Sequence, residues 1–115
     1  MAEAKVTVTR VLLYRKGKPA PGFYRNESLS EYSCVVDILV ENATVPKIRV
    51  FAFIKGSFEL TVWTHEMTNV SPGTYAIVKG FRSVTEDYSW GRVDQMLDGL
   101  GIGSGPVPLC AKAVY

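Results

Sequence analysis

The sequence has little cysteine and histidine, and it has no long hydrophobic run. Its two cysteines, Cys34 and Cys110, lack CxxC spacing, and His65 is the only histidine. This excludes a metal site built from Cys and His clusters and predicts two reduced, buried thiols in strands. No apolar run approaches the roughly 18–20 residues of a membrane span. The N-terminal residues lead directly into a strand pattern, so we expect no signal peptide and no membrane partner.

Motifs of enzyme active sites are also missing. The chain has no GxSxG, no HExxH, no P-loop and no GxGxxG within a βαβ pattern. Its carboxylates are scattered over polar faces and turns, where solvated side chains are the ordinary case. Gly99–Gly105 resembles a phosphate loop but has no preceding parallel strand and no following helix. We therefore expect no enzymatic activity, no cofactor and no metal.

Length and composition indicate one globular domain spanning residues 1–115. Hydrophobic residues make up 47% of the chain and charged residues 21%, which is ordinary for a folded domain. A chain of 115 residues can bury one real core but not two. The net charge of +2 is too small to indicate a polyanionic partner. The distribution of the charges is therefore more informative than their sum.

Strand patterns cover most of the chain. Lys5–Arg15 is rich in β-branched residues, and its apolar phase shifts by one residue, which predicts a bulge near Arg10. Tyr32–Glu41 alternates cleanly, and Arg92–Gly99 could hold a short helix. The chain predicts an all-β fold, a small five- to six-stranded Greek-key barrel of the oligonucleotide/oligosaccharide-binding type with long projecting hairpin loops. Further strands are expected in Pro46–Gly56, Ser57–His65, Thr74–Val84 and Pro106–Tyr115.

One predicted strand, Pro46–Gly56, has an unusual outer face. Its inner face is purely apolar, whereas the outer face alternates cations with aromatic rings. Cations that meet phosphates and rings that stack on bases are what a single-stranded nucleic-acid platform requires. A loop, a helix or a second subunit covering the rings remains an equal alternative. The inner face is Ile48, Val50, Ala52 and Ile54, and the outer face is Lys47, Arg49, Phe51, Phe53 and Lys55.

A basic arm follows the first strand and gives a second signal of the same kind. No acidic residue interrupts Arg15–Arg25, and Gly and Pro residues predict a projecting loop. Its alternative is a solvated hairpin whose rings pack on the barrel. Trp90, beside Arg92 in a polar loop, could stack on a base or cap the core. The arm's candidate nucleic-acid-binding residues are Arg15, Lys16, Lys18, Phe23, Tyr24 and Arg25.

Several short motifs, in order along the chain, resemble the gene V single-stranded DNA-binding proteins of filamentous bacteriophages. The run from Arg15 to Pro19 matches R-x-G-K-P, and Ser28–Asp37 matches S-L-x-E-x-x-C-x-V-D. Ser71–Tyr75 is similar to the family's A-P-G-x-Y strand, which leads to a Phe, and Ser89–Gly91 to its aromatic-Gly loop. The sequence departs from the family in the arm, where Ala20–Asn26 is an insertion, and in a longer middle and tail.

The resemblance implies a small oligonucleotide-binding barrel that forms a two-fold homodimer. Such proteins coat single-stranded phage DNA cooperatively, block its conversion to duplex during replication, and act in the cytoplasm of the bacterial host. They also bind RNA, so the resemblance implies single-stranded DNA or RNA as the ligand. We therefore predict a sequence-tolerant single-stranded DNA-binding protein. The alternative is a β-barrel protein-interaction module whose exposed rings, Phe51, Phe53 and Trp63, bind another protein without nucleic acid.

Overall fold

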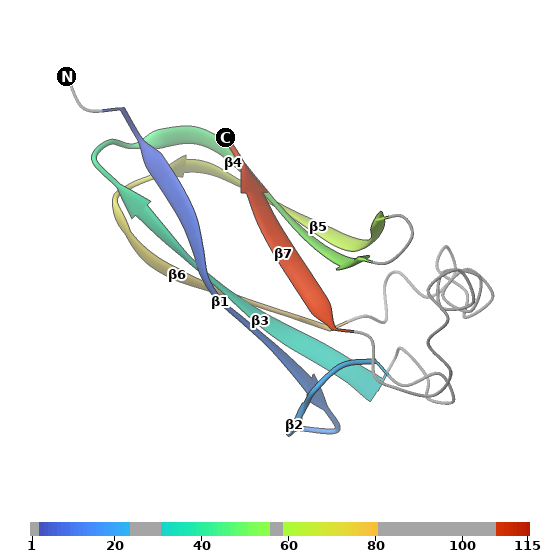
Figure 1. Cartoon of the computed structure of the whole chain (residues 1–115). Coiled ribbons are helices and arrows are strands. Elements are labelled where there is room, and N and C mark those ends of the chain that lie inside the picture. Colours follow the sequence, from blue (N-terminus) through green and yellow to red (C-terminus); the bar gives the residue numbers. More distant parts are fainter. Residues whose placement is uncertain (1–2, 24–30, 56–58, 81–107) are drawn as a thin grey trace.

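Seven strands form two antiparallel sheets in the computed structural model of this chain, which describes residues 3–23, 31–55, 59–80 and 108–115 (Figure 1). One sheet has the strand order β2-β1-β3-β6 and the other β5-β4-β7. No helix capable of crossing a membrane occurs among these residues. The strands are β1 (Lys5–Arg15), β2 (Lys18–Ala20), β3 (Tyr32–Glu41), β4 (Val45–Lys55), β5 (Glu59–Val70), β6 (Gly73–Gly80) and β7 (Leu109–Val114).

The core lies between the two sheets. Every second residue of β3 is buried, and the predicted inner face of β4 is completely buried. Each sheet therefore contributes one apolar face, as the period-two alternation requires. Trp63 on β5 donates a hydrogen bond from Nε1 to the Cys34 sulfur on β3, at 3.2 Å, and so connects the two layers. The β4 residues of this core are Ile48, Val50, Ala52 and Ile54.

Two bulges change the phase of the strands. The register of β1 against β3 shifts between Val8 and Arg10, which confirms the predicted bulge. The second bulge lies between β4 and β5, where Ala52 pairs with Trp63 but Phe53 pairs with Thr61. The extra residue on β5 leaves the alternation of β4 intact, so Phe53 stays on the outer face.

Residues with positive φ make the tight turns. Lys16 and Gly17, at φ 51° and 79°, form the two-residue connection between β1 and β2, a geometry that matches the twist of paired strands. Asn42, at φ 78°, begins the turn between β3 and β4. Gly73, at φ 152°, starts β6 directly after the Ser71-Pro72 turn. Lys16 lies in the β1–β2 turn and Lys18 is the first residue of β2, so both basic residues lie at this end of the hairpin.

The all-β class predicted from the sequence is confirmed, and the structure shows that both sheets are antiparallel. The two sheets share no hydrogen-bonded ladder within the described residues, so this part of the chain is not a closed barrel. The described residues form seven strands, one more than the six expected, because β2 is an additional short strand. β5 continues to Val70, beyond the predicted end at His65. The helix predicted within Arg92–Gly99 lies outside the described residues.

Candidate nucleic-acid interface

The outer face of the three-stranded sheet carries the cations that the sequence placed there. Lys47 and Arg49 are exposed on β4, with about half of each side chain open to solvent. Phe51, next on the same face, is half-buried. The opposite face of β4 is core, so packing fixes the direction in which these three side chains point. The structure therefore brings two cations and one ring together on a single rigid strand.

Phe53 differs from the expectation. The sequence predicts an exposed ring, but Phe53 is only 7% exposed, so this prediction is wrong. The ring lies on the outer face, where it pairs with Cys110 of β7. The ammonium of Lys112 lies 5.2 Å from its centroid and 6.0 Å from that of Phe51. Alternation fixes the face of a side chain, but only its neighbours decide whether it is exposed.

One carboxylate is shared by the two β4 cations. Glu66 of β5 lies opposite Arg49, with Oε1 3.3 Å from Lys47 Nζ and Oε2 3.6 Å from Arg49 Nε. All three side chains are about half exposed, so water screens these pairs and each is weak. One carboxylate therefore faces two cations at this cluster, which leaves it with one net positive charge.

β7 adds residues to this face that the sequence analysis did not assign. The register places Val114 beside Arg49 and Lys112 beside Phe51. Tyr115 and Val114 join Lys47 and Arg49 in lining an open groove of about 250 Å³. The alternation of Cys110, Lys112 and Val114 was visible in the sequence, but nothing in it indicated that β7 pairs with β4. That pairing is a long-range contact.

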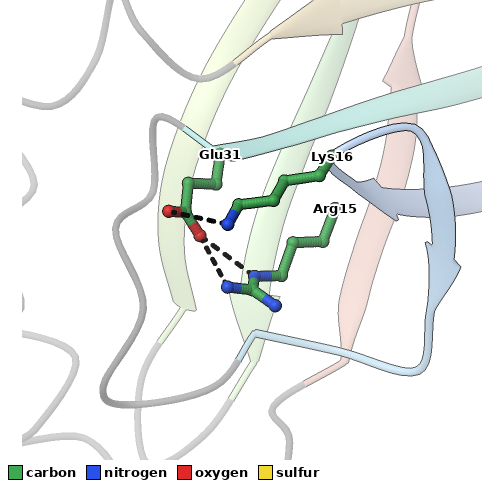
Figure 2. A network of polar contacts seen from close by, with 3 residues as sticks. All are labelled: Arg15, Lys16 and Glu31. Carbon is green, nitrogen blue, oxygen red and sulfur yellow. Dashed lines mark hydrogen bonds and ion pairs between the residues drawn. The ribbon is translucent and has the colours of Figure 1, made fainter.

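A second cluster lies at the base of the arm (Figure 2). Glu31 accepts hydrogen bonds from Arg15 Nε and Nη2 at 3.0 and 2.8 Å, and its other carboxylate oxygen lies 3.8 Å from Lys16 Nζ. The backbone N–H of Lys16 also donates to the Glu31 carbonyl at 3.0 Å. Lys18 is exposed on β2. This second cluster therefore repeats the β4 arrangement, in which one carboxylate is shared by two cations.

Phe23 is not an exposed ring of the arm. It is 0% exposed, belongs to the core, and packs against Tyr32 with ring centroids 4.9 Å apart. The prediction of a stacking role for Phe23 is therefore wrong for this structure, and the alternative of a ring packed on the body of the protein holds. Tyr24, Arg25 and Trp90 lie outside the described residues, as does the side chain of Lys55.

The arm and the β4 cations are not brought together. Figure 1 shows β2 at one end of the molecule and the end of β7 at the other, and Arg49 pairs with Val114 at the end of β7. The longest dimension of the molecule is 50 Å. The two basic clusters therefore lie apart from each other in the molecule.

The remaining reactive side chains have structural roles. Both cysteines are free, as predicted, and Cys34 is buried; the predicted burial of Cys110 is wrong, because its side chain is half-buried. Burial raises the pKa of Cys34 to about 11, although the Trp63 hydrogen bond and nearby Lys79 oppose this shift. Burial, with a smaller contribution from Lys79, lowers the pKa of His65. Within the described residues, no group of three or more His, Cys, Asp or Glu side chains could hold a metal ion.

Trp63 does not belong to an exposed surface. It is 3% exposed, and the ammonium of Lys79 lies 5.4 Å from its ring centroid. This removes Trp63 from the interaction surface predicted as the alternative to nucleic-acid binding. Comparison with models of protein families, with curated proteins and with solved structures finds no match to this chain.

Proposed function

We propose that this chain is a sequence-tolerant single-stranded DNA-binding protein without enzymatic activity. The observation that carries the proposal is the outer face of β4, where Lys47, Arg49 and Phe51 are fixed side by side. Cations that track phosphates beside a ring that can stack are the two requirements of a single-stranded nucleic-acid surface. The proposal includes a barrel of the oligonucleotide-binding type, homodimers, and coating of phage DNA in a bacterial host, which blocks conversion to duplex.

Charge supplies the main part of the affinity in this mechanism. Phosphates replace Glu66 at Lys47 and Arg49, and condensed counterions leave the strand. The arm cluster, Arg15 and Lys16, undergoes the same exchange at Glu31. Because these contacts go to the backbone of the nucleic acid, they carry little information about base sequence.

Stacking supplies the second part. Phe51 is half-buried, so its ring is supported by the sheet and still partly accessible. A base stacked on an aromatic ring gains about 1–3 kcal/mol, and every base has a face suited to it. The proposal therefore accounts for binding without base preference.

The motifs shared with the gene V family support the proposal through their positions. The Arg15–Pro19 motif forms the β1–β2 turn, and the two basic residues at its tip are exposed. The Glu and Cys of the second motif are Glu31, which binds Arg15, and Cys34, which packs in the core. These positions suit a basic hairpin anchored to a stable sheet.

One observation favours a protein partner as a second candidate function. Val78 of β6 is 72% exposed on the outer face of the four-stranded sheet, where it pairs with Val35. Leu12 lies opposite Val35 on β1. This stripe of one exposed and two half-buried apolar side chains favours contact with another protein.

A salt series of fluorescence titrations with poly(dT) tests the proposed function. We expect tight binding at low salt that weakens linearly in a plot of log affinity against log salt. Competition with poly(U) then compares DNA with RNA. Lack of binding at low salt would refute the proposal and leave the protein-interaction module.

A further inference from the structure

We propose that Thr64 of β5 and Lys79 of β6 form a phosphate subsite beside Phe51, so that the nucleic-acid surface extends from β4 across β5 to the other sheet. This inference rests on the proposed function and names two residues to which neither the sequence analysis nor the resemblance assigns a binding role. Lys79 belongs to the four-stranded sheet, whereas the surface proposed on β4 lies on the three-stranded sheet.

Lys79 reaches from one sheet to the other. β5 and β6 follow each other along the chain but belong to different sheets (Figure 1). The ammonium of Lys79 donates a hydrogen bond to the Thr64 carbonyl at 3.1 Å, and it lies 5.4 Å from the centroid of the Trp63 ring. The positive charge of a β6 residue is therefore held against β5 by a carbonyl and an aromatic ring.

Thr64 connects this charge to the surface on β4. It lies directly opposite Phe51, so both side chains are on the outer face of the three-stranded sheet. The Cβ atoms of residues opposed in this way are about 4.5–5.5 Å apart. Thr64 is exposed and Phe51 is half-buried. A ring, a hydroxyl and an ammonium therefore follow one another across the sheet, in the order Phe51, Thr64, Lys79.

The charge of Lys79 has no counter-ion in the protein. Within the part of the chain that the structure describes, no carboxylate pairs with Lys79. An ammonium has three N–H donors, and the Thr64 carbonyl takes one of them. Lys47 and Arg49, in contrast, share Glu66, which a phosphate has to displace. Lys79 needs no such exchange, and its contacts with β5 reduce the ordering that accompanies binding.

A nucleotide of a single strand matches this row of groups. Its base stacks on Phe51, and its phosphate accepts hydrogen bonds from the Thr64 hydroxyl and the Lys79 ammonium. Hydroxyl and lysine side chains are common phosphate contacts, and contacts to phosphate carry no base information. The subsite is therefore compatible with sequence-tolerant binding. An acidic peptide would pair with Lys79 but needs no base-stacking ring beside it.

Anisotropy titrations of a fluorescein-labelled dT oligonucleotide at several salt concentrations test the inference. Lys79→Gln should lower the slope of log affinity against log salt by about 0.7, the contribution of one phosphate on a single strand. Lys79→Arg keeps the charge and should retain the slope. Thr64→Val should weaken binding about 2- to 12-fold with an unchanged slope, because a hydroxyl releases no counterion.

Lys5→Gln and Thr74→Val are the matched controls. Both residues are exposed on the four-stranded sheet, opposite Glu41 and Leu39, and their substitutions should have smaller effects on binding. Thermal melts of all variants distinguish loss of the bridge between the sheets from loss of a phosphate contact. If Lys79→Gln lowers the melting temperature but keeps the salt slope of the unmodified protein, Lys79 is only a structural bridge and the subsite is refuted.

The outcomes separate the inference from the function on which it rests. If the unmodified protein binds, and Lys79→Gln and Thr64→Val behave like their controls, the subsite is refuted and the proposed function stands. If Lys79→Arg loses as much of the slope as Lys79→Gln, the contact does not depend on charge, which also refutes the subsite. If the unmodified protein does not bind the oligonucleotide at low salt, the proposed function fails and the inference fails with it.

Discussion

Glu31 binds Arg15 through a single carboxylate oxygen, with Nε at 3.0 Å and Nη2 at 2.8 Å from Oε2 (Figure 2). The other oxygen faces Lys16, so one carboxylate serves two cations of the arm. Glu66 does the same for Lys47 and Arg49. In both proposed contact regions, a glutamate therefore forms ion pairs with the cations to which a phosphate would bind.

Glu31→Gln should strengthen binding to single-stranded DNA. The amide still accepts a hydrogen bond from Arg15 but no longer competes with phosphate as an anion. Partly exposed pairs of this kind are worth about 0.2–1 kcal/mol, so a gain of up to about fivefold in affinity is expected. The measurement is an oligonucleotide titration at fixed salt. Glu41→Gln at the far end of β3 is the control, since no ion pair involves its side chain in the described part of the chain. An equal gain in the control would mean that only the total charge matters.

Arg49→Ala and Phe51→Ala should separate charge from stacking on β4. Arg49→Ala should weaken DNA binding and reduce the salt slope by about one phosphate's worth. Phe51→Ala should weaken binding by about 1–3 kcal/mol with an almost unchanged slope, because a ring releases no counterions. Titrations at four or more salt concentrations give both quantities. An unchanged affinity in Phe51→Ala would show that the ring supports the sheet and does not contact DNA.

Phe53→Ala and Phe23→Ala should mainly cost stability. Both rings are buried, and removal of a buried Phe side chain typically costs about 3–5 kcal/mol. Val50→Ala, on the inner face of β4, should also destabilise the protein through a smaller cavity. Urea denaturation measures all three. A stable Phe53→Ala variant with weakened DNA binding would contradict this prediction and show that Phe53 belongs to the binding surface.

The thiols should differ in reactivity and in their effect on stability. Burial raises the pKa of Cys34 from 9.0 to about 11, so Cys34 should react with a thiol reagent far more slowly than the half-buried Cys110.

The pKa of Cys34 is higher in the folded than in the unfolded protein, so the contribution of this thiol to stability is complete below pH 9 and is lost as pH rises towards 11. Denaturation at pH 8 and pH 10.5 should show a decrease, of the order of 2 kcal/mol at most, that Cys34→Ala lacks. Equal decreases in both proteins would assign the effect to other groups.

The sequence by itself determined the features that depend only on the spacing of side chains along a single strand. The alternation of Tyr32–Glu41, the inner face of β4 and the bulge near Arg10 all follow from side-chain spacing along one strand, and the structure confirms them. The outward direction of Lys47 and Arg49 follows in the same way, because the other face of their strand is core. These features depend only on which side of a strand is apolar.

The tertiary structure decided everything that depends on partners distant in the sequence. Phe53 has the spacing of an exposed residue, and Phe23 lies in a polar segment, yet contacts with Lys112 and Tyr32 accompany their burial. The pairing of β4 with β7, which brings Lys112 and Tyr115 to the face, joins segments about sixty residues apart. No local pattern encodes such a pairing, because its free energy comes from apolar area that both segments bury together.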